Sequence, residues 1–275
     1  MLTERELKTI VADVLAGLGY RVTGAPEAPN EAVASDGTWQ SPEAMAEMRA
    51  ATPARIDIGR AGARYDTESW LKFRIDHGAA RDAIFHEVSP EFLSALGAIQ
   101  LETQVADRRE YLVRPDLGRR LTPESEALLR ERGRAGAMIQ LVVVDGLSGT
   151  AIEANAMDFI RAFRDGLKLE GIDPEGLGAP IFVRMGRVAV MDQIGETLRP
   201  ELIVELVGER SGLVTAESMS AYFCYRPGLK SIESDRTLIS NIHRGGIPPV
   251  EAGAHAARLA RRILEAKVSG VKLGL

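Results

Sequence analysis

The chain has 275 residues, 45% of them apolar, which is enough to bury the core of one large domain. Its 34 basic and 39 acidic residues give a net charge of −5, whereas binding to nucleic acid phosphates favours a basic excess. The single cysteine, Cys224, excludes an intramolecular disulfide and a cysteine zinc cluster. No apolar run reaches the roughly 18 residues of a membrane-spanning helix. We therefore expect a protein of a reducing compartment, with neither nucleic acid nor membrane as a partner.

Residues 1–19 predict a separate amphipathic helix. Thr3 and Glu6 have the spacing of a capping box, and Gly19 is suited to end the helix. Apolar side chains recur at helical spacing and form one stripe, namely Leu7, Ile10, Val11, Val14, Leu15 and Leu18. Residues 20–41 are rich in Ala, Pro and Glu and predict a flexible linker. Because so short a helix cannot bury its stripe alone, it either folds back onto the main domain or docks onto a partner or shell protein.

Residues 42–275 predict the folded body. The run Ile139–Val144 is nearly continuous in β-branched residues and predicts a central strand buried on both faces. Strand–helix–strand units after it favour parallel pairing. We predict the α/β class: a small Rossmann-like, mainly parallel sheet flanked by helices, with a helical N-terminal part. Two further strands are expected at 181–183 and 202–207, and a turn at 108–120. The expected helices are 43–51, 67–84, one within 88–100, 123–133, 151–170, 191–198, 217–225 and one from 249 onward.

The stretch from 181 to 212 is the expected ligand edge, because ligands of open α/β sheets sit beyond the carboxyl ends of the strands. The chain has no phosphate-binding loop, dinucleotide fingerprint, nucleophile elbow or metal-ligand spacing, and its four histidines are far apart. Four carboxylates near the predicted strand ends act either as bases or as helix caps and hydrogen-bond acceptors: Asp145, Asp192, Glu196 and Glu209. From the residues alone, a stand-alone α/β enzyme that acts on a nucleotide or phosphate ligand through Asp145 and Glu209 stays open.

Several motifs resemble the small subunit of ethanolamine ammonia-lyase. The resemblance covers nearly the whole body in one order and at matching spacing, and it leaves out residues 20–41. The motifs are Phe182-Val183-Arg184-x-Gly186-Arg187-Val188, Asp192-Gln193-Ile194-Gly195-Glu196, Val207-Gly208-Glu209-Arg210, Tyr111-Leu112-x-Arg114-Pro115-Asp116, Asp145-Gly146-Leu147-Ser148, and Asp235-Arg236-Thr237 followed by Ile239-Ser240-Asn241-Ile242-His243.

The resemblance implies a subunit of the enzyme that converts ethanolamine to acetaldehyde and ammonia by adenosylcobalamin radical chemistry. In that family a TIM-barrel large subunit binds the substrate, and the small subunit covers the cofactor at the subunit interface. The family's cofactor contacts fall on Val188, Glu209 and Leu238, and the family pattern has cysteine at the last position. Arg184, near a predicted strand end, is our own additional candidate contact. We expect neither a catalytic side chain nor a metal ligand from this chain.

The N-terminal helix also resembles the short leader that directs this enzyme into ethanolamine-utilising microcompartments. The resemblance therefore implies two partners, the large subunit and the microcompartment shell or cargo. It also implies a location in a bacterial microcompartment of the cytoplasm.

Overall fold

The structure is a computed structural model that describes residues 41–52, 54–210, 212 and 215–274. The predicted helix 1–19 and nearly all of the linker lie outside these residues. The chain forms two compact units, with the division between Trp70 and Leu71. None of the helices formed by the described residues is both long and apolar enough to cross a bilayer.

The described residues of the first unit form one whole helix, a small hairpin and the beginning of a second helix. Helix α2 (Pro42–Ala51) begins after Ser41, whose hydroxyl accepts a hydrogen bond from the Ala44 amide. It ends two residues before Pro53, which cannot donate a backbone hydrogen bond. Strands β1 (Arg60–Ala61) and β2 (Arg64–Tyr65) pair antiparallel around Gly62. The predicted helix at 43–51 is therefore confirmed.

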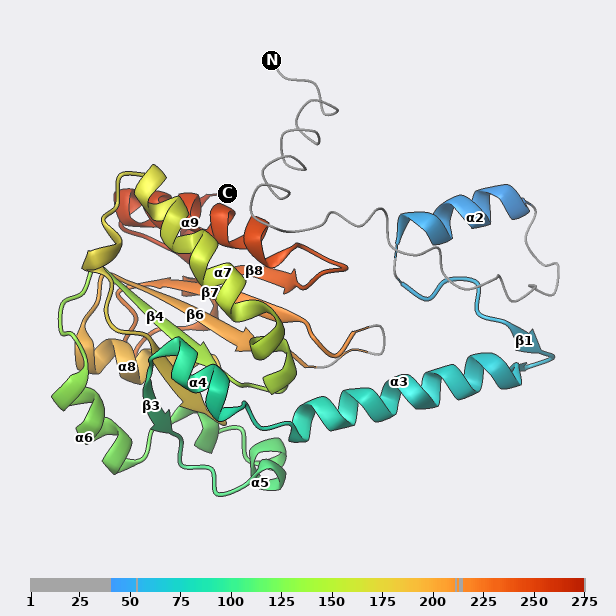
Figure 1. The fold of residues 1–275 in the computed structure, drawn as a ribbon, viewed down its shortest axis with the longest axis horizontal. Helices are drawn as coiled ribbons and strands as arrows, with labels where there is room; N and C mark the ends of the chain where they lie inside the picture. Colours follow the sequence, from blue (N-terminus) through green and yellow to red (C-terminus); the bar gives the residue numbers. More distant parts are fainter. Residues whose placement is uncertain (1–40, 53, 211, 213–214, 275) are drawn as a thin grey trace, which may run out of the picture. The chain divides into compact units, whose positions relative to one another are not determined.

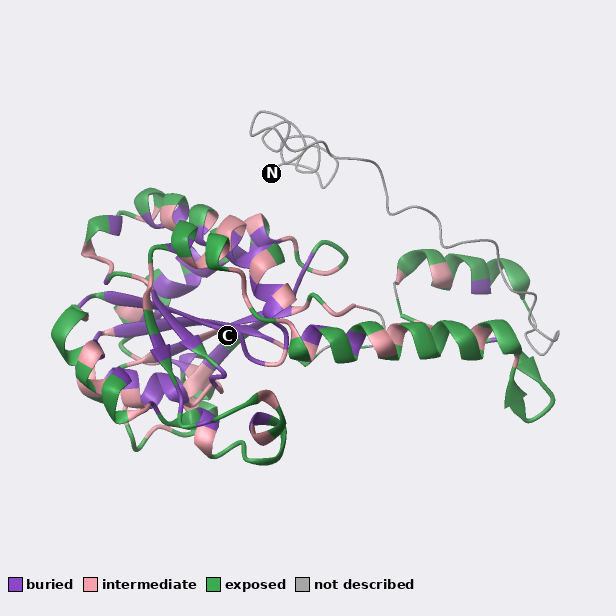
Figure 2. Cartoon of the chain, turned by 60° about the horizontal axis from the view of Figure 1, so that its bottom comes forward, coloured by how far each residue is buried: buried purple, intermediate pink, exposed green. Residues whose placement is uncertain are grey.

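Helix α3 (Thr67–Phe85) confirms the predicted helix at 67–84, and it crosses the division between the units. Only Ala80 and Ala83 are buried in it. In the part that belongs to the second unit, Ile75 is 70% exposed and Leu71 is 50% exposed. Figure 2 shows the contrast between this exposed helix and the buried strands.

The second unit is built on a six-stranded sheet in the order β3-β5-β4-β6-β7-β8 (Figure 1). The first four strands in this order pair parallel, and β7 and β8 add two antiparallel pairings. The strands are β3 (Ile99–Glu102), β4 (Ile139–Val144), β5 (Ile181–Arg184), β6 (Leu202–Gly208), β7 (Met219–Tyr225) and β8 (Arg236–Ile242). The α/β class and the mainly parallel sheet are thus confirmed, and the Rossmann-like assignment stays a prediction.

Helices cover both faces of the sheet. On the side we call the α7 side, apolar residues of α7 (Gly149–Leu169) and α9 (Pro249–Ala266) pack against alternate strand residues such as Phe182 and Leu206. On the opposite α8 side, α6 (Pro123–Arg132) and α8 (Val190–Leu198) pack against Val183 and Val207. All six residues of β4 are buried, as predicted for a strand covered on both faces. The shorter elements are α4 (Pro90–Leu96), α5 (Arg108–Val113), η1 (Leu117–Arg119), η2 (Pro174–Gly176), η3 (Glu233–Asp235) and η4 (Gly270–Leu273).

The predicted helix at 217–225 is wrong, because this segment contains strand β7. The segment is rich in aromatic and small side chains that pack well on a pleated surface, and tertiary pairing decides its conformation. The predicted turn at 108–120 is also wrong in its first half, where α5 forms. The Asp107 carboxylate caps α5 by accepting from the amides of Arg109 and Glu110. Strands β3 and β8 were not predicted.

Candidate functional site

The carboxyl ends of β4, β5 and β6 meet at one edge of the sheet. The connection after β4 leads to α7 on one face, and the connection after β5 leads to α8 on the other, so the two loops diverge here. Ligands of open α/β sheets bind at such divergences. The turns after β4 and β6 also touch: Gly146 has φ +58, and a Cβ there would lie 2.3 Å from the carbonyl oxygen of Gly208. Residues after all three strands therefore face a common edge.

Three of the four predicted contact residues lie on the α8 side of the sheet. Val188 lies in the turn before α8 and packs half-buried against the apolar cluster of this side. Glu209 directly follows β6, and strand alternation places it on the same side as Val207. Leu238 on β8 pairs in register with Tyr222 on β7, which packs against the same cluster.

Tyr222 connects two of these predicted residues. Its hydroxyl donates a hydrogen bond of 3.0 Å to Oε1 of Glu209, and its cross-strand neighbour is Leu238. Glu209 and Tyr222 are half-buried, and Leu238 is 47% exposed. We call the surface made by Val188, Glu209, Tyr222 and Leu238 the Glu209 face. It combines apolar side chains with one carboxylate, so it suits a large, mostly apolar ligand that carries hydrogen-bond donors.

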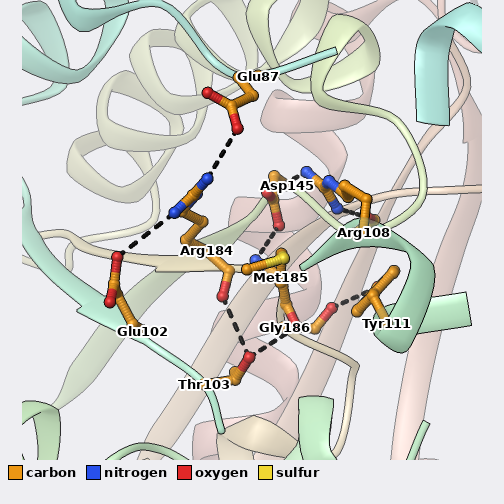
Figure 3. A network of polar contacts seen from close by, with 10 residues as sticks. Glu87, Glu102, Thr103, Arg108, Tyr111, Asp145, Arg184, Met185 and Gly186 are labelled. Atoms are coloured by element: carbon orange, nitrogen blue, oxygen red, sulfur yellow. Dashed lines mark hydrogen bonds and ion pairs between the residues drawn. The ribbon is translucent and has the colours of Figure 1, made fainter. Parts of the chain in front are cut away.

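Arg184 lies elsewhere. It ends β5 on the same side as Phe182, which packs on the α7 side, because side chains alternate along a strand. Its guanidinium lies 2.7 Å from a carboxylate oxygen of Glu87 and 3.6 Å from one of Glu102 (Figure 3). The structure thus brings Val188, Glu209 and Leu238 onto one side and leaves Arg184 on the other.

A buried ion pair fixes the edge between the two sides. The Asp145 carboxylate accepts from the Arg108 guanidinium and, at 2.7 Å, from the backbone amide of Met185 (Figure 3). Burial raises the pKa of Asp145, although Arg108 and the Met185 amide act in the opposite direction. Both carboxylate oxygens have partners inside the protein, so Asp145 supports the loop after β5. Because its carboxylate is already satisfied, Asp145 is a poor base, which argues against the alternative of a stand-alone enzyme that uses Asp145.

Three more side chains hold the turn that carries Val188. The hydroxyl of Tyr111 donates to the carbonyl of Gly186 at 2.7 Å, and that of Thr103 donates to the carbonyl of Met185 at 3.0 Å (Figure 3). The Arg187 guanidinium lies 4.0 Å from the centre of the Tyr111 ring and donates to the Tyr111 carbonyl at 2.7 Å. Met185 has φ +53, a conformation that costs free energy and persists because these contacts determine it. The turn is thus pre-organised.

A second polar layer lies next to the Glu209 face, on the same side of the sheet. Glu205 on β6 is fully buried, and neither of its carboxylate oxygens has a hydrogen-bond partner among the described residues. Burial raises the pKa of Glu205 well above its usual value, and nearby Arg236 opposes this. Arg236 on β8 pairs at 2.6 Å with Asp192 on α8, so the layer links the helix to the edge of the sheet. This contact favours the second alternative left open for Asp192, a hydrogen-bond acceptor.

Sequence reasoning missed Tyr222, because the segment that contains it was predicted to be a helix. The aromatic side chains within 219–225, which are favoured in strands, were the available signal. Glu205 was missed because a lone carboxylate within an apolar run has no motif. Among the described residues, no three His, Cys, Asp or Glu side chains are arranged to hold a metal ion.

The fold and the Glu209 face together define an α/β domain with a candidate ligand edge. A sequence model of the family described as ethanolamine ammonia-lyase light chain matches residues 42–274. The small subunit of ethanolamine ammonia-lyase from Clostridioides difficile strain 630 is 49% identical over 84% of this chain and 78% of its own length. Those of Clostridium perfringens (48%; 84% and 77%) and Listeria monocytogenes serotype 4a (47%; 84% and 78%) are similarly close. The chain belongs to this family of ammonia-lyase subunits.

Proposed function

We propose that this chain is the small subunit that covers adenosylcobalamin in an ethanolamine ammonia-lyase, at the interface with a catalytic TIM-barrel large subunit. The observation that carries the proposal is the Glu209 face, which joins three separately predicted residues on one side of the sheet. Val188, Glu209 and Leu238 come from a loop, a strand end and an edge strand, and the fold places them on the same side of the sheet.

The residues of this face fit the periphery of a corrinoid. Its amide groups are donors for the free lone pairs of Glu209, and its apolar surface matches Val188 and Leu238. Leucine replaces the family's cysteine at 238 and retains an apolar surface. When bound, the cofactor supplies the adenosyl radical that starts the reaction. Arg184 stays a predicted contact, and reaching the face would require its ion pairs to open.

The residues of this chain position and enclose the cofactor and transfer no proton. The buried Arg108–Asp145 pair and the Tyr111 hydroxyl hold the turn that carries Val188. A pre-organised protein surface over a cofactor excludes water and suppresses side reactions of a reactive intermediate. Stabilising a fixed geometry is therefore the contribution we assign to this chain.

The exposed apolar side chains of α3 are evidence that a partner subunit covers this helix. Leu71, Ile75 and Phe85 are exposed in the part of the helix that belongs to the second unit. A helix with exposed apolar residues along much of its length needs a covering surface, and such patches mark interfaces. Ile75→Asp should weaken co-purification with the large subunit, and Lys72→Asp, a neighbouring exposed polar position, is the control. Equal recovery of the large subunit with the Ile75 variant would remove α3 from the interface.

We also propose that residues 1–19 direct the enzyme into a bacterial microcompartment. The support is the resemblance of this stripe to the family's leader. Deletion of residues 1–20 should abolish encapsulation, measured as co-purification with shells, and leave turnover intact. Loss of turnover in the deleted enzyme would count against a purely targeting role.

The test of the cofactor site is Glu209→Ala in the assembled enzyme. The Kd for adenosylcobalamin should rise about tenfold, because a hydrogen bond to a charged group is lost. Glu131→Ala, at an exposed carboxylate of α6, is the matched control and should bind as the unmodified enzyme does. An unchanged Kd in Glu209→Ala would remove Glu209 from the site.

A further inference from the structure

Tyr222 lies between two residues of the Glu209 face and is rigidly placed. It belongs to β7, the fifth strand in the sheet order, which pairs on one side with β6 and on the other with β8. In register it opposes Glu205 on the first of these strands and Leu238 on the second. Its ring packs against the apolar cluster of the α8 side. An aromatic side chain held by two neighbouring strands and a core has little freedom to move.

Glu209 is held less firmly. Its backbone amide donates to the carbonyl of Ser218 at 2.9 Å, which continues the ladder between β6 and β7 by one residue. Its side chain is half-buried and forms no ion pair that the structure records. Among the described residues, the Tyr222 hydroxyl is the hydrogen-bond partner of this carboxylate, at 3.0 Å. The direction of the Glu209 side chain therefore depends on one donor.

The Tyr222 hydroxyl is suited to be a permanent donor. Burial raises the pKa of Tyr222, and so do Glu209 and Glu205, while Arg236 acts in the opposite direction. The phenol therefore keeps its proton across the physiological range. A bond from a neutral donor to a carboxylate is charge-assisted, and it leaves the second oxygen of Glu209 free to accept from a ligand.

We propose that Tyr222 is a positioning residue that orients Glu209 for the cofactor. This inference rests on the proposed function, because it gives a second residue to the same site. Without the hydroxyl, Glu209 samples several rotamers, and binding a ligand then costs the free energy of ordering a flexible side chain. Tyr222 therefore affects cofactor binding through its hydrogen bond to Glu209.

The experiment is a double-mutant cycle on adenosylcobalamin binding to the assembled enzyme. Tyr222→Phe keeps the ring and removes the donor, and it should raise the Kd about fivefold. In a Glu209→Ala background the same substitution should change the Kd by less than about twofold, because the oriented group is absent. In a Glu209→Gln background, where an amide oxygen still accepts the hydroxyl proton, an effect of Tyr222→Phe should reappear.

Two controls separate positioning from general destabilisation. Tyr225→Phe removes a hydroxyl from the same strand and should leave the Kd unchanged. The melting temperature of Tyr222→Phe should stay within a few degrees of that of the unmodified enzyme.

The outcomes are distinguishable. If Glu209→Ala weakens binding and Tyr222→Phe does not, or if their effects add, Tyr222 does not act through Glu209 and this inference is overturned. If Glu209→Ala has no effect, the proposed cofactor site fails, and the inference fails with it.

Discussion

Two buried polar layers at the carboxyl edge of the sheet differ in how well they are satisfied. In the first, both oxygens of Asp145 have partners, namely Arg108 and the Met185 amide, and the hydroxyls of Tyr111 and Thr103 also donate to the same turn. Nε of Arg187 is the atom of this layer without a partner among the described residues. In the second, both oxygens of Glu205 lack a partner, as do one oxygen of Asp192 and Nε of Arg236, among the described residues.

The difference indicates that the buried polar groups of the two layers have different roles. A satisfied network rigidifies a turn, whereas each unsatisfied group costs free energy and requires another explanation. The first layer holds the turn of Val188, and it is a structural support. The second lies beside Tyr222 on the same side of the sheet, where stability alone gives no reason for a carboxyl group. The predictions below test this division.

The largest effect is expected from the satisfied layer. Asp145→Ala leaves the buried Arg108 guanidinium and the Met185 amide without partners and should cost about 3–5 kcal/mol of stability. The melting temperature of the assembled enzyme should fall on the order of 10 °C. Asp116→Ala removes an exposed carboxylate that also pairs with an arginine, and it should leave the melting temperature unchanged. Similar losses of melting temperature in both variants would show that the buried ion pair stabilises the protein no more than an exposed one.

The second prediction concerns pH and the unsatisfied layer. The pKa of Glu205 in the folded protein is raised above the usual value of 4.5, so the unfolded chain loses this proton first as the pH rises. Stability from this group is full below pH 4.5 and falls with increasing pH, at up to about 1.4 kcal/mol per pH unit.

Glu205→Gln removes this titration while keeping the shape of the side chain. It should therefore raise the melting temperature at pH 7 and have little effect near pH 4.5. Thermal unfolding of both proteins across this range measures the difference. A variant that is less stable than the unmodified protein at neutral pH would show that Glu205 has a partner and is ionised.

Leu238 allows a smaller, local test of the Glu209 face. Leu238→Asp places a second carboxylate beside Tyr222, the hydrogen-bond partner of Glu209, and should weaken cofactor binding about tenfold. Leu238→Cys introduces the residue that the resemblance implies for this position and should change the Kd by less than about twofold. Binding titrations of both variants decide whether the position needs an apolar surface. Unchanged binding in Leu238→Asp would place the cofactor away from β8.

Arg184 should show the smallest effect on stability. Its ion pairs with Glu87 and Glu102 are exposed, and such pairs contribute about 0–1 kcal/mol. Arg184→Ala should thus fold normally, and on the geometry described here it should bind the cofactor with an unchanged Kd. A clear loss of affinity would return Arg184 to the site.

The sequence predicts the strands and helices whose own pattern is strong. Ile139–Val144 and the strands that begin at Ile181 and Leu202 are confirmed because continuous apolar runs bounded by turns have few other solutions. Strand β7 was mispredicted because its pairing with β6 decides its conformation. Helix α5 was mispredicted because its cap, Asp107, decides where it begins. Local periodicity shows neither of these contacts.

The candidate site divides in the same way. The resemblance supplied Val188, Glu209 and Leu238, but the sequence cannot show that Tyr222 joins the last two, because the contact depends on the register of three strands. The separation of Arg184 from them likewise depends on which side of the sheet each residue faces. Sequence motifs identify residues, whereas strand register and alternation decide which of them act together.

Reconstitution tests the central claim most directly. The purified chain is assayed for conversion of ethanolamine with adenosylcobalamin, first alone and then mixed with the large subunit. We predict no turnover from the chain alone and cofactor-dependent turnover from the mixture. Sustained lyase activity of the isolated chain would contradict a subunit that covers the cofactor and leaves the chemistry to its partner.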